Sequence, residues 1–280
     1  MEENAVPWLF PMGPPKDMVF PPKQYLFNLF PTHYTQLRVI TQWLKEQAKW
    51  QNVGIIYSDN EAGKAGLEDF KNMVKGSNMQ VVVEQAIEEG AGSAAVQVAK
   101  IKEANPDLVF LVGMTHAPAA LAIKEIRNIG WDVQIMIYMP ITGDAILTLA
   151  TPEDTEGLLG AFWGYQYDLH NPDANSPCLK DAYDTMVKYF PDSKDQGIDG
   201  IIEHYLSVEV FIEALRRAGE NPTRESLISA LESLDNYDMC KGFCTFSPNR
   251  REGVTGGVIK QVVDGQWKNI SKFIDPGLGE

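Results

Sequence analysis

Cysteine, histidine and positive charge are scarce in this chain of 280 residues. Three cysteines are too few for a disulfide scaffold, and the four histidines lack metal-ligand spacing, so no metal site is predicted. The 38 acidic residues outnumber the 24 basic ones, and the resulting charge of -14 repels a phosphate backbone. Nucleic acid is therefore not expected as a partner.

Long apolar runs are also missing. A membrane-spanning helix needs about 20 consecutive apolar residues, and the longest candidate, Leu108 to Ile123, is interrupted by a glycine, a histidine and a proline. The opening stretch "MEENAVPWLFPMGPPK" lacks the basic start and the continuous apolar core of a secretory signal. Either the protein stays in the cytoplasm, or the chain is a mature or truncated form whose export signal lay upstream.

The sequence does contain a strict alternation of apolar runs and helical patterns. With 44% hydrophobic residues, the chain can bury about three quarters of its unfolded surface in one or two domains. Parallel strands need a crossover to connect them, so the alternation predicts an α/β fold with a doubly wound parallel sheet over roughly residues 27–165. The five predicted strands are "NVGIIYSD", "MQVVVEQ", "PDLVFLVG", "DVQIMIY" and "EGLLGAFWGY".

The pattern changes after Tyr165. Three predicted helices follow without intervening strands, and the middle one has a broad apolar face formed by Ile201, Tyr205, Val208, Ile212 and Leu215. Further on, the Asp-Gly pair of "VVDGQW" predicts a β-hairpin. An apolar helix face must be buried, and the five predicted strands already have their own helices. We therefore expect that part of the fold is missing or that a partner supplies it.

Six stretches carry a resemblance that covers nearly all of the chain. In order they are "VPWLFPMGPP", "QYLFNLFPTHYTQLRVITQWL", "VGIIYSDNEAGKAGLEDFK", "DLVFLVGMTHAPAALAIKEIRNIGW", "YLSVEVFIEALRRAGENPTRESLISALESL" and "FSPNRREGVTGGVIKQVVDGQWKNI". Their order and spacing resemble the type I periplasmic binding proteins, in the branch that serves branched-chain amino-acid and related ABC importers.

The resemblance implies two α/β lobes joined by a hinge. Residues 1–26 are expected to end the first lobe and cross over, and residues 27–165 to form the second lobe. Residues 166–243 then supply first-lobe helices, and residues 244–280 cross over and return to the second lobe. In the family about a hundred residues of first-lobe sequence come before these blocks. The chain therefore resembles an N-terminally truncated member with an incomplete first lobe.

The function that the resemblance implies is binding rather than catalysis. The two lobes of such proteins close over a small solute, and a membrane permease recognises the closed form. We expect an extracytoplasmic, periplasmic solute-binding protein of an ABC importer, without a cofactor and with possible self-association through exposed first-lobe helices. A ligand-sensing domain of a receptor or cytoplasmic regulator is the alternative. An enzyme is disfavoured because no nucleophile, base and orienting group form a set.

The first expected ligand contacts lie around the predicted hinge and the first turn of the second lobe. The first-lobe turn that receives a ligand carboxylate falls at Gly13 and Pro14, and a proline has no N–H to donate. Ala62 stands where the family commonly has a tyrosine. Trp163, at the end of the fifth predicted strand, is expected either to line the cleft or to pack in the core.

Two further contact regions follow later strands of the second lobe. The aromatic contact of the family falls at Thr115 or His116, and its acidic residue for an amino group falls at Ile141 or Thr142. Hydrogen bonds to charged groups contribute about 1.5 to 3 kcal/mol each. Losing two of them would weaken binding of an amino acid roughly a hundred- to ten-thousandfold. An apolar, aromatic or carboxylic solute is therefore expected rather than a leucine-like zwitterion.

Several motifs have a structural interpretation beside the functional one. Gly63-x-x-Gly66 lacks the third glycine of a dinucleotide fingerprint and the Lys-Ser/Thr pair of a phosphate loop, so its turn either lines the ligand or only joins a strand to a helix. A single partly buried histidine such as His116 is more often structural. Acidic pairs such as Glu88 and Glu89 lie in polar connectors, which favours solvated faces over acid-base catalysis.

The motif "CKGFC" allows three interpretations. Cys240 and Cys244 could form a local disulfide, half of a metal site or two unpaired thiols. No second Cys/His pair stands nearby, which weakens the zinc interpretation. In an exported protein a Cys240–Cys244 disulfide is expected, which leaves Cys178 free.

Overall fold

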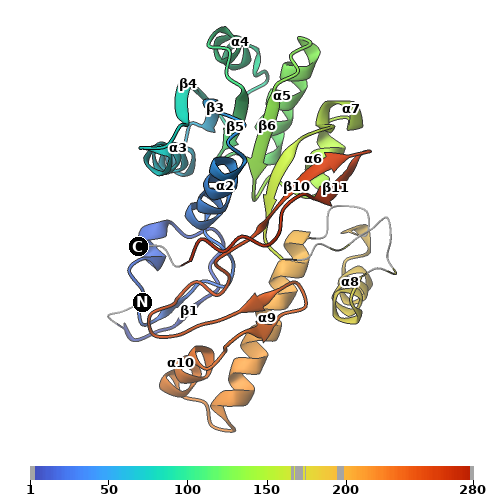
Figure 1. Ribbon diagram of the computed structural model, residues 1–280. Coiled ribbons are helices and arrows are strands. Elements are labelled where there is room, and N and C mark those ends of the chain that lie inside the picture. Colours follow the sequence, from blue (N-terminus) through green and yellow to red (C-terminus); the bar gives the residue numbers. More distant parts are fainter. Residues whose placement is uncertain (1–3, 165–166, 168–172, 174, 194–198, 278–280) are drawn as a thin grey trace. The chain divides into compact units, whose positions relative to one another are not determined.

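The computed structural model describes residues 4–164, 167, 173, 175–193 and 199–277, and it divides the chain into two compact units. Unit 1 comprises residues 1–32, 163–255 and 277–280, and unit 2 comprises residues 33–162 and 256–276. The chain therefore passes between the units after Thr32, Phe162, Thr255 and Pro276. Figure 1 shows the helices and strands of both units.

Unit 2 is built on one sheet of seven strands. They are β3 (Asn52–Ser58), β4 (Gln80–Ile87), β5 (Leu108–Val112), β6 (Gln134–Tyr138), β7 (Leu159–Phe162), β10 (Val258–Val263) and β11 (Gln266–Asn269). Their order is β11-β10-β7-β6-β5-β3-β4. The pairs from β4 to β7 are all parallel, whereas β10 joins β7 and β11 antiparallel. All five strands predicted from the apolar runs are confirmed, and so is the Asp-Gly hairpin, which joins β10 to β11.

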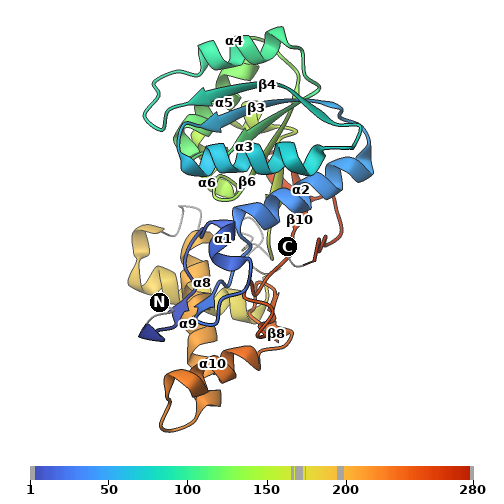
Figure 2. The same ribbon diagram turned by 90° about the vertical axis from the view of Figure 1, so that its left-hand side faces the viewer.

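Helices cover both faces of this sheet. On one face lie α2 (His33–Gln47) and α3 (Glu61–Val74), and on the other lie α4 (Ala95–Glu103), α5 (His116–Asn128) and α6 (Asp144–Leu149). Figure 2 shows α3 and α4 on opposite sides of β3 and β4. Neighbouring strand residues point to opposite faces, so Ile55 packs in the first core and Ile56 in the second. The predicted doubly wound α/β sheet is confirmed.

Unit 1 has little sheet in its described part. β1 (Trp8–Leu9) pairs with β2 (Leu26–Phe27) in parallel, and β8 (Tyr237–Asp238) pairs with β9 (Phe243–Cys244) antiparallel. Its helices are α1 (Lys16–Val19), α8 (Pro177–Tyr189), α9 (Asp199–Ala218) and α10 (Arg224–Glu232), with a 3-10 turn at Pro191–Ser193. Among the residues that the structure describes, no helix is long and apolar enough to cross a membrane.

Helix α9 buries a different face from the one predicted from the sequence. The buried residues follow each other at spacings of four: Ile202, Leu206, Val210 and Ala214. Of the face expected from the sequence, Tyr205, Ile212 and Leu215 are only half-buried, and Val208 is 55% exposed. The side chain of Ile201 lies outside the described residues. Part of this expected face thus remains open to solvent within unit 1.

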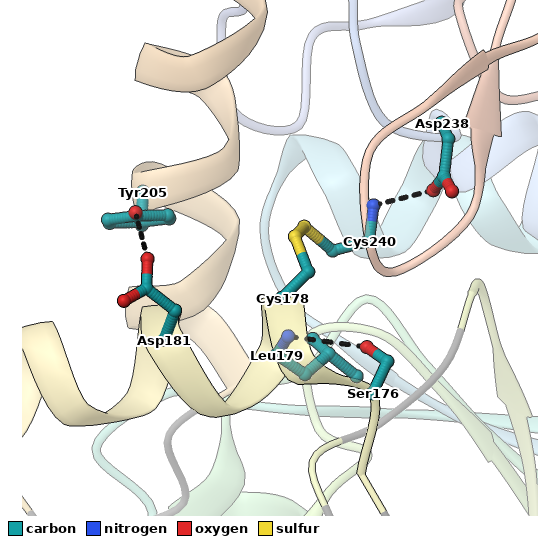
Figure 3. Close-up of a disulfide and its surroundings, with 7 residues drawn as sticks. All are labelled: Ser176, Cys178, Leu179, Asp181, Tyr205, Asp238 and Cys240. Carbon is teal, nitrogen blue, oxygen red and sulfur yellow. Dashed lines mark hydrogen bonds between the residues drawn. A yellow bond between two sulfur atoms is a disulfide. The ribbon is translucent and has the colours of Figure 1, made fainter.

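The disulfide differs from the expected pairing. Cys178, in the first turn of α8, is bonded to Cys240, in the turn between β8 and β9, with 5.6 Å between the two Cα atoms (Figure 3). Cys244 is free and buried, and this burial raises the pKa of its thiol to about 12. The expectation of a Cys240–Cys244 bond was wrong because β9 directs Cys244 into the core, whereas Cys240 lies in the turn beside α8.

Candidate functional site

The candidate site is the carboxyl edge of the unit 2 sheet. The strands from β3 to β6 are parallel and end at this edge, where α3, α5 and α6 begin. Side chains in the connecting loops therefore converge there, which is the usual ligand position in sheets of this kind. Of the eight residues expected from the sequence, five lie in these loops or in the first turns of the helices that follow them: Ala62, Thr115, His116, Ile141 and Thr142. Gly13, Pro14 and Trp163 belong to unit 1.

Two glycines bring the loops after β3 and β5 into direct contact. A side chain on Gly63 would place its Cβ 2.0 Å from the carbonyl oxygen of Ser58. A Cβ on Gly113, whose φ is +63°, would lie 2.6 Å from the Cα of Gly63. Neither position has room for a side chain. Close packing therefore explains the first glycine of the Gly63-x-x-Gly66 motif, and it brings the start of α3 beside the end of β5.

Glu89 connects three of the loops at this edge. It follows β4, and its Oε1 accepts hydrogen bonds from Ser58 Oγ (2.7 Å) and Asn60 Nδ2 (3.0 Å). Its Oε2 accepts a hydrogen bond of 2.5 Å from Thr115 Oγ1. The Asn60 side chain also accepts a bond from the Gly63 N–H, which caps α3. Glu89 is exposed, as expected for a connector, but the sequence did not indicate that its carboxylate joins three strand ends.

His116 and Ala62 lie in the first turns of α5 and α3. His116 is the first residue of α5 and is half-buried, and this burial lowers the pKa of its imidazole. The ring is therefore neutral at pH 7 and can donate one hydrogen bond and accept another. Ala62 is exposed in the first turn of α3 and presents only a methyl group.

The loop after β6 contains a buried hydroxyl without a partner. Thr142 is only 6% exposed, and its Oγ1 has no hydrogen-bond partner among the residues described. Ile141 beside it is buried. Neither residue carries the carboxylate that the resemblance implies at this position. A buried polar group left unpaired costs about 1 to 3 kcal/mol. Because this unfavourable hydroxyl lies in a loop at the carboxyl edge, Thr142 is a candidate for contact with a solute or a water molecule.

Three residues at the same edge were not expected from the sequence. The His33 ring, at the start of α2, lies edge-on to Tyr138 with 5.5 Å between the ring centroids. Burial lowers the pKa of His33 and raises that of Tyr138, whose hydroxyl accepts a bond from the Gly113 N–H. Gln36 accepts a bond from the Met139 N–H at 3.1 Å. Only the position of Tyr138 at a strand end could have signalled this group.

The expected contacts in unit 1 have their own surroundings. Gly13 is exposed with a φ of +59°, and Pro14 is buried. Trp163 is 2% exposed, and its indole N–H donates to Glu203 Oε1 at 2.9 Å. The Lys241 ammonium lies 3.2 Å from the same oxygen and 4.7 Å from the Trp163 ring centroid. Within unit 1 Trp163 therefore packs in a core with a buried ion pair, which agrees with the structural alternative for this residue.

The described residues contain no group of three or more His, Cys, Asp or Glu side chains that could hold a metal ion. The edge offers neutral and anionic hydrogen-bonding groups instead. These groups suit recognition of a small molecule.

A family model for periplasmic binding proteins matches residues 1–266. The chain belongs to the periplasmic binding protein family. This membership confirms the resemblance seen in the sequence. No curated protein matches the chain.

Solved structures of this family share the fold over nearly the whole chain. A branched-chain amino-acid ABC transporter protein from Thermus thermophilus with bound valine is 18% identical, with a TM-score of 0.85. The alignment covers 98% of this chain and 73% of that one. A leucine-binding protein from Thermotoga maritima is 18% identical with a TM-score of 0.76, over 98% of this chain and 75% of that one. A protein from Rhodospirillum rubrum described as a branched-chain amino-acid ABC transporter is 20% identical with a TM-score of 0.75, over 96% and 74% of the two chains.

Proposed function

We propose that this protein is the periplasmic solute-binding component of an ABC importer and that it delivers a small organic solute to a membrane permease. The observation that carries the proposal is the convergence at the carboxyl edge of unit 2. Side chains from three loops, a half-buried neutral imidazole and a buried hydroxyl without a described partner lie where strands of one parallel sheet end. Membership of the binding-protein family and the shared fold support this function.

We assign unit 2 to the second lobe and unit 1 to the first. The chain passes between them four times, after Thr32, Phe162, Thr255 and Pro276. The first three crossings suit a hinge that closes over a solute. The first lobe is proposed to be incomplete, because the described strands of unit 1 form only two sheets of two strands. The half-exposed face of α9 is then the surface for self-association, which light scattering of the purified protein tests.

The solute class follows from the groups at the edge. The Thermus thermophilus relative holds valine, so an amino-acid-like solute is the first candidate. The family's acidic position is occupied here by Ile141 or Thr142, and we propose that Glu89 supplies the carboxylate for an amino group. Its Oε2 accepts only one hydrogen bond among the described residues, which leaves acceptor capacity for a ligand N–H. Solutes that carry only a carboxylate and an apolar part form the second candidate class.

Native mass spectrometry and calorimetry of the purified protein test this function. We expect either a retained solute or binding of at least one of valine, leucine, phenylalanine and phenylacetate. Replacing Glu89→Gln should weaken an amine-bearing solute about tenfold or more, because a hydrogen bond to a charged group is lost, and should leave phenylacetate unchanged. Glu88→Gln, which removes the neighbouring exposed carboxylate, is the matched control. A protein that retains no solute and binds none of the four contradicts the proposed function.

A further inference from the structure

Unit 2 has a cavity of about 520 Å³ at the edge of its sheet opposite the candidate site. Trp50 and Asp107 come just before β3 and β5, Gln134 opens β6, and Gly157 comes just before β7, so the cavity lies at the amino ends of four strands. Gly113 lies six positions beyond Asp107, at the other end of β5, which amounts to about 20 Å of extended chain. The cavity is therefore a place distinct from the proposed solute site.

The lining includes a half-buried guanidinium without an ion-pair partner in the described part of the chain. Arg127 donates through Nη1 to the carbonyl oxygens of Trp131 (3.1 Å) and Val133 (3.0 Å), and through Nε to that of Asp154 (3.3 Å). These bonds fix the orientation of the guanidinium. No described hydrogen bond uses its Nη2. Burial lowers the pKa of the group, and the Asp132 and Asp154 carboxylates act in the opposite direction. A cation held in this way is stabilised by an anionic ligand.

Two indole rings form apolar walls of the same cavity. Trp50 is 7% exposed and Trp131 is half-buried, and both line the cavity. The exposed ammonium of Lys49 lies 4.9 Å from the centroid of the Trp50 ring, which places a second cation at the lining. Neither indole N–H donates a hydrogen bond among those described. Aromatic walls beside two cations suit a flat ligand with one anionic group.

Carboxylates in the lining limit the charge of that ligand. Asp107 accepts bonds from the backbone N–H groups of Gln51 and Asn52, and Glu156 accepts bonds from those of Asp264 and Gly265. These two carboxylates thus have structural partners, and Asp132 adds a third carboxylate to the lining. Three carboxylates repel a di- or trianion such as a phosphate ester more strongly than a monoanion, because the repulsion grows with the charge of the ligand.

We propose that this cavity is a second small-molecule site that takes an aromatic monocarboxylate. The carboxylate binds Arg127, with Lys49 as a second cation, and the ring packs against Trp50 and Trp131. The site goes beyond the proposed solute binding, because its residues take no part in the carboxyl edge and it does not depend on closure of the two lobes.

NMR titration of the 15N-labelled protein with benzoate tests this site. We expect saturable shifts of the indole N–H signals of Trp50 and Trp131, with benzamide and phenyl phosphate producing at most weak shifts. Arg127→Gln should weaken benzoate about tenfold or more, because a charge-assisted bond is lost. Lys49→Gln should weaken it about two- to fivefold. Because Lys49 is exposed, the second variant remains informative if Arg127→Gln does not fold.

The controls separate this site from the proposed function. Lys100→Gln removes an exposed lysine of α4 that does not line the cavity, and it should leave the benzoate affinity unchanged. Benzoate shifts confined to the backbone signals of Thr115 and His116 overturn the second site while supporting the proposed solute site. Equal binding of benzamide, or no saturable shift of either indole signal, also overturns the second site and has no bearing on the carboxyl edge.

Discussion

The two units of this protein are stabilised in different ways. Unit 2 has a seven-stranded sheet with an apolar core on each face, so burial of side chains such as Phe110 accounts for its fold. Unit 1 has two short sheets in its described part, and specific links join its segments: the Cys178–Cys240 disulfide and the buried Lys241–Glu203 ion pair. Unit 1 also has a smaller apolar cluster that includes Leu179, Met186 and Ile202. With little sheet, the unit depends more on its individual long-range contacts.

The largest expected effect is loss of the disulfide. Its cysteines lie 62 residues apart, and in the chain-entropy model Cys178→Ser lowers the free energy of unfolding of unit 1 by about 4 kcal/mol. Hydrogen exchange followed by mass spectrometry should show faster exchange in α8 and in β8–β9, with β3 and β5 of unit 2 unchanged. Cys244→Ala, which leaves the disulfide intact, is the control and should cost about 1 kcal/mol. An equal increase of hydrogen exchange in both units would contradict the view that the two units are stabilised in different ways.

The next largest effect is expected from the buried ion pair. Lys241→Met leaves the buried Glu203 carboxylate without its cation, and the free energy of unfolding of unit 1 should fall by about 3 kcal/mol in urea denaturation. The double variant Lys241→Met/Glu203→Gln should recover much of this loss, because no uncompensated charge remains and the Trp163 N–H keeps an acceptor. Lys268→Met, which removes an exposed ion pair with Asp264, should change stability by less than about 1 kcal/mol.

The smallest expected changes in stability come from replacing two buried threonines of unit 2. Thr155 Oγ1 donates to the carbonyl oxygens of Thr151 or Pro152, so Thr155→Val should cost about 1 kcal/mol in thermal or urea unfolding. Thr142→Val removes a hydroxyl that has no described partner, and it should leave stability equal or raise it by up to about 1 kcal/mol. The same variant should weaken solute binding. A Thr142→Val protein as destabilised as Thr155→Val would show that the hydroxyl is satisfied.

Much of the fold could be predicted from local patterns. Runs such as "LVFLV" are buried on both faces of a parallel sheet, so the strands of unit 2 are visible in the sequence. The start of α10 also has a local signal, because the Thr223 side chain accepts a hydrogen bond from the Ser226 N–H only three residues away and so caps the helix. The buried face of α9 could not be predicted from the sequence alone, because it depends on which other elements pack against the helix.

The candidate site was only partly predictable. Alignment of strand ends with the family placed Thr115, His116 and Thr142 at one edge, because parallel strands carry their following loops to the same side. Glu89 was assigned to a solvated connector, since its partners Ser58 and Thr115 are distant in the sequence. The second-site cavity has no local signal either, because Trp50, Arg127 and Gly157 come from three separate loops or helices.

The sequence by itself determined the strands of unit 2, the Asp-Gly hairpin and the family, because each depends on residues close together in the chain or on the order of such blocks. The tertiary structure alone decided which cysteines pair, that Lys241 is buried against Glu203, and that Glu89 joins three loops. These outcomes depend on side chains that lie tens of residues apart and meet only after the backbone has folded. A one-dimensional pattern records spacing along the chain, and these contacts depend on distance in space.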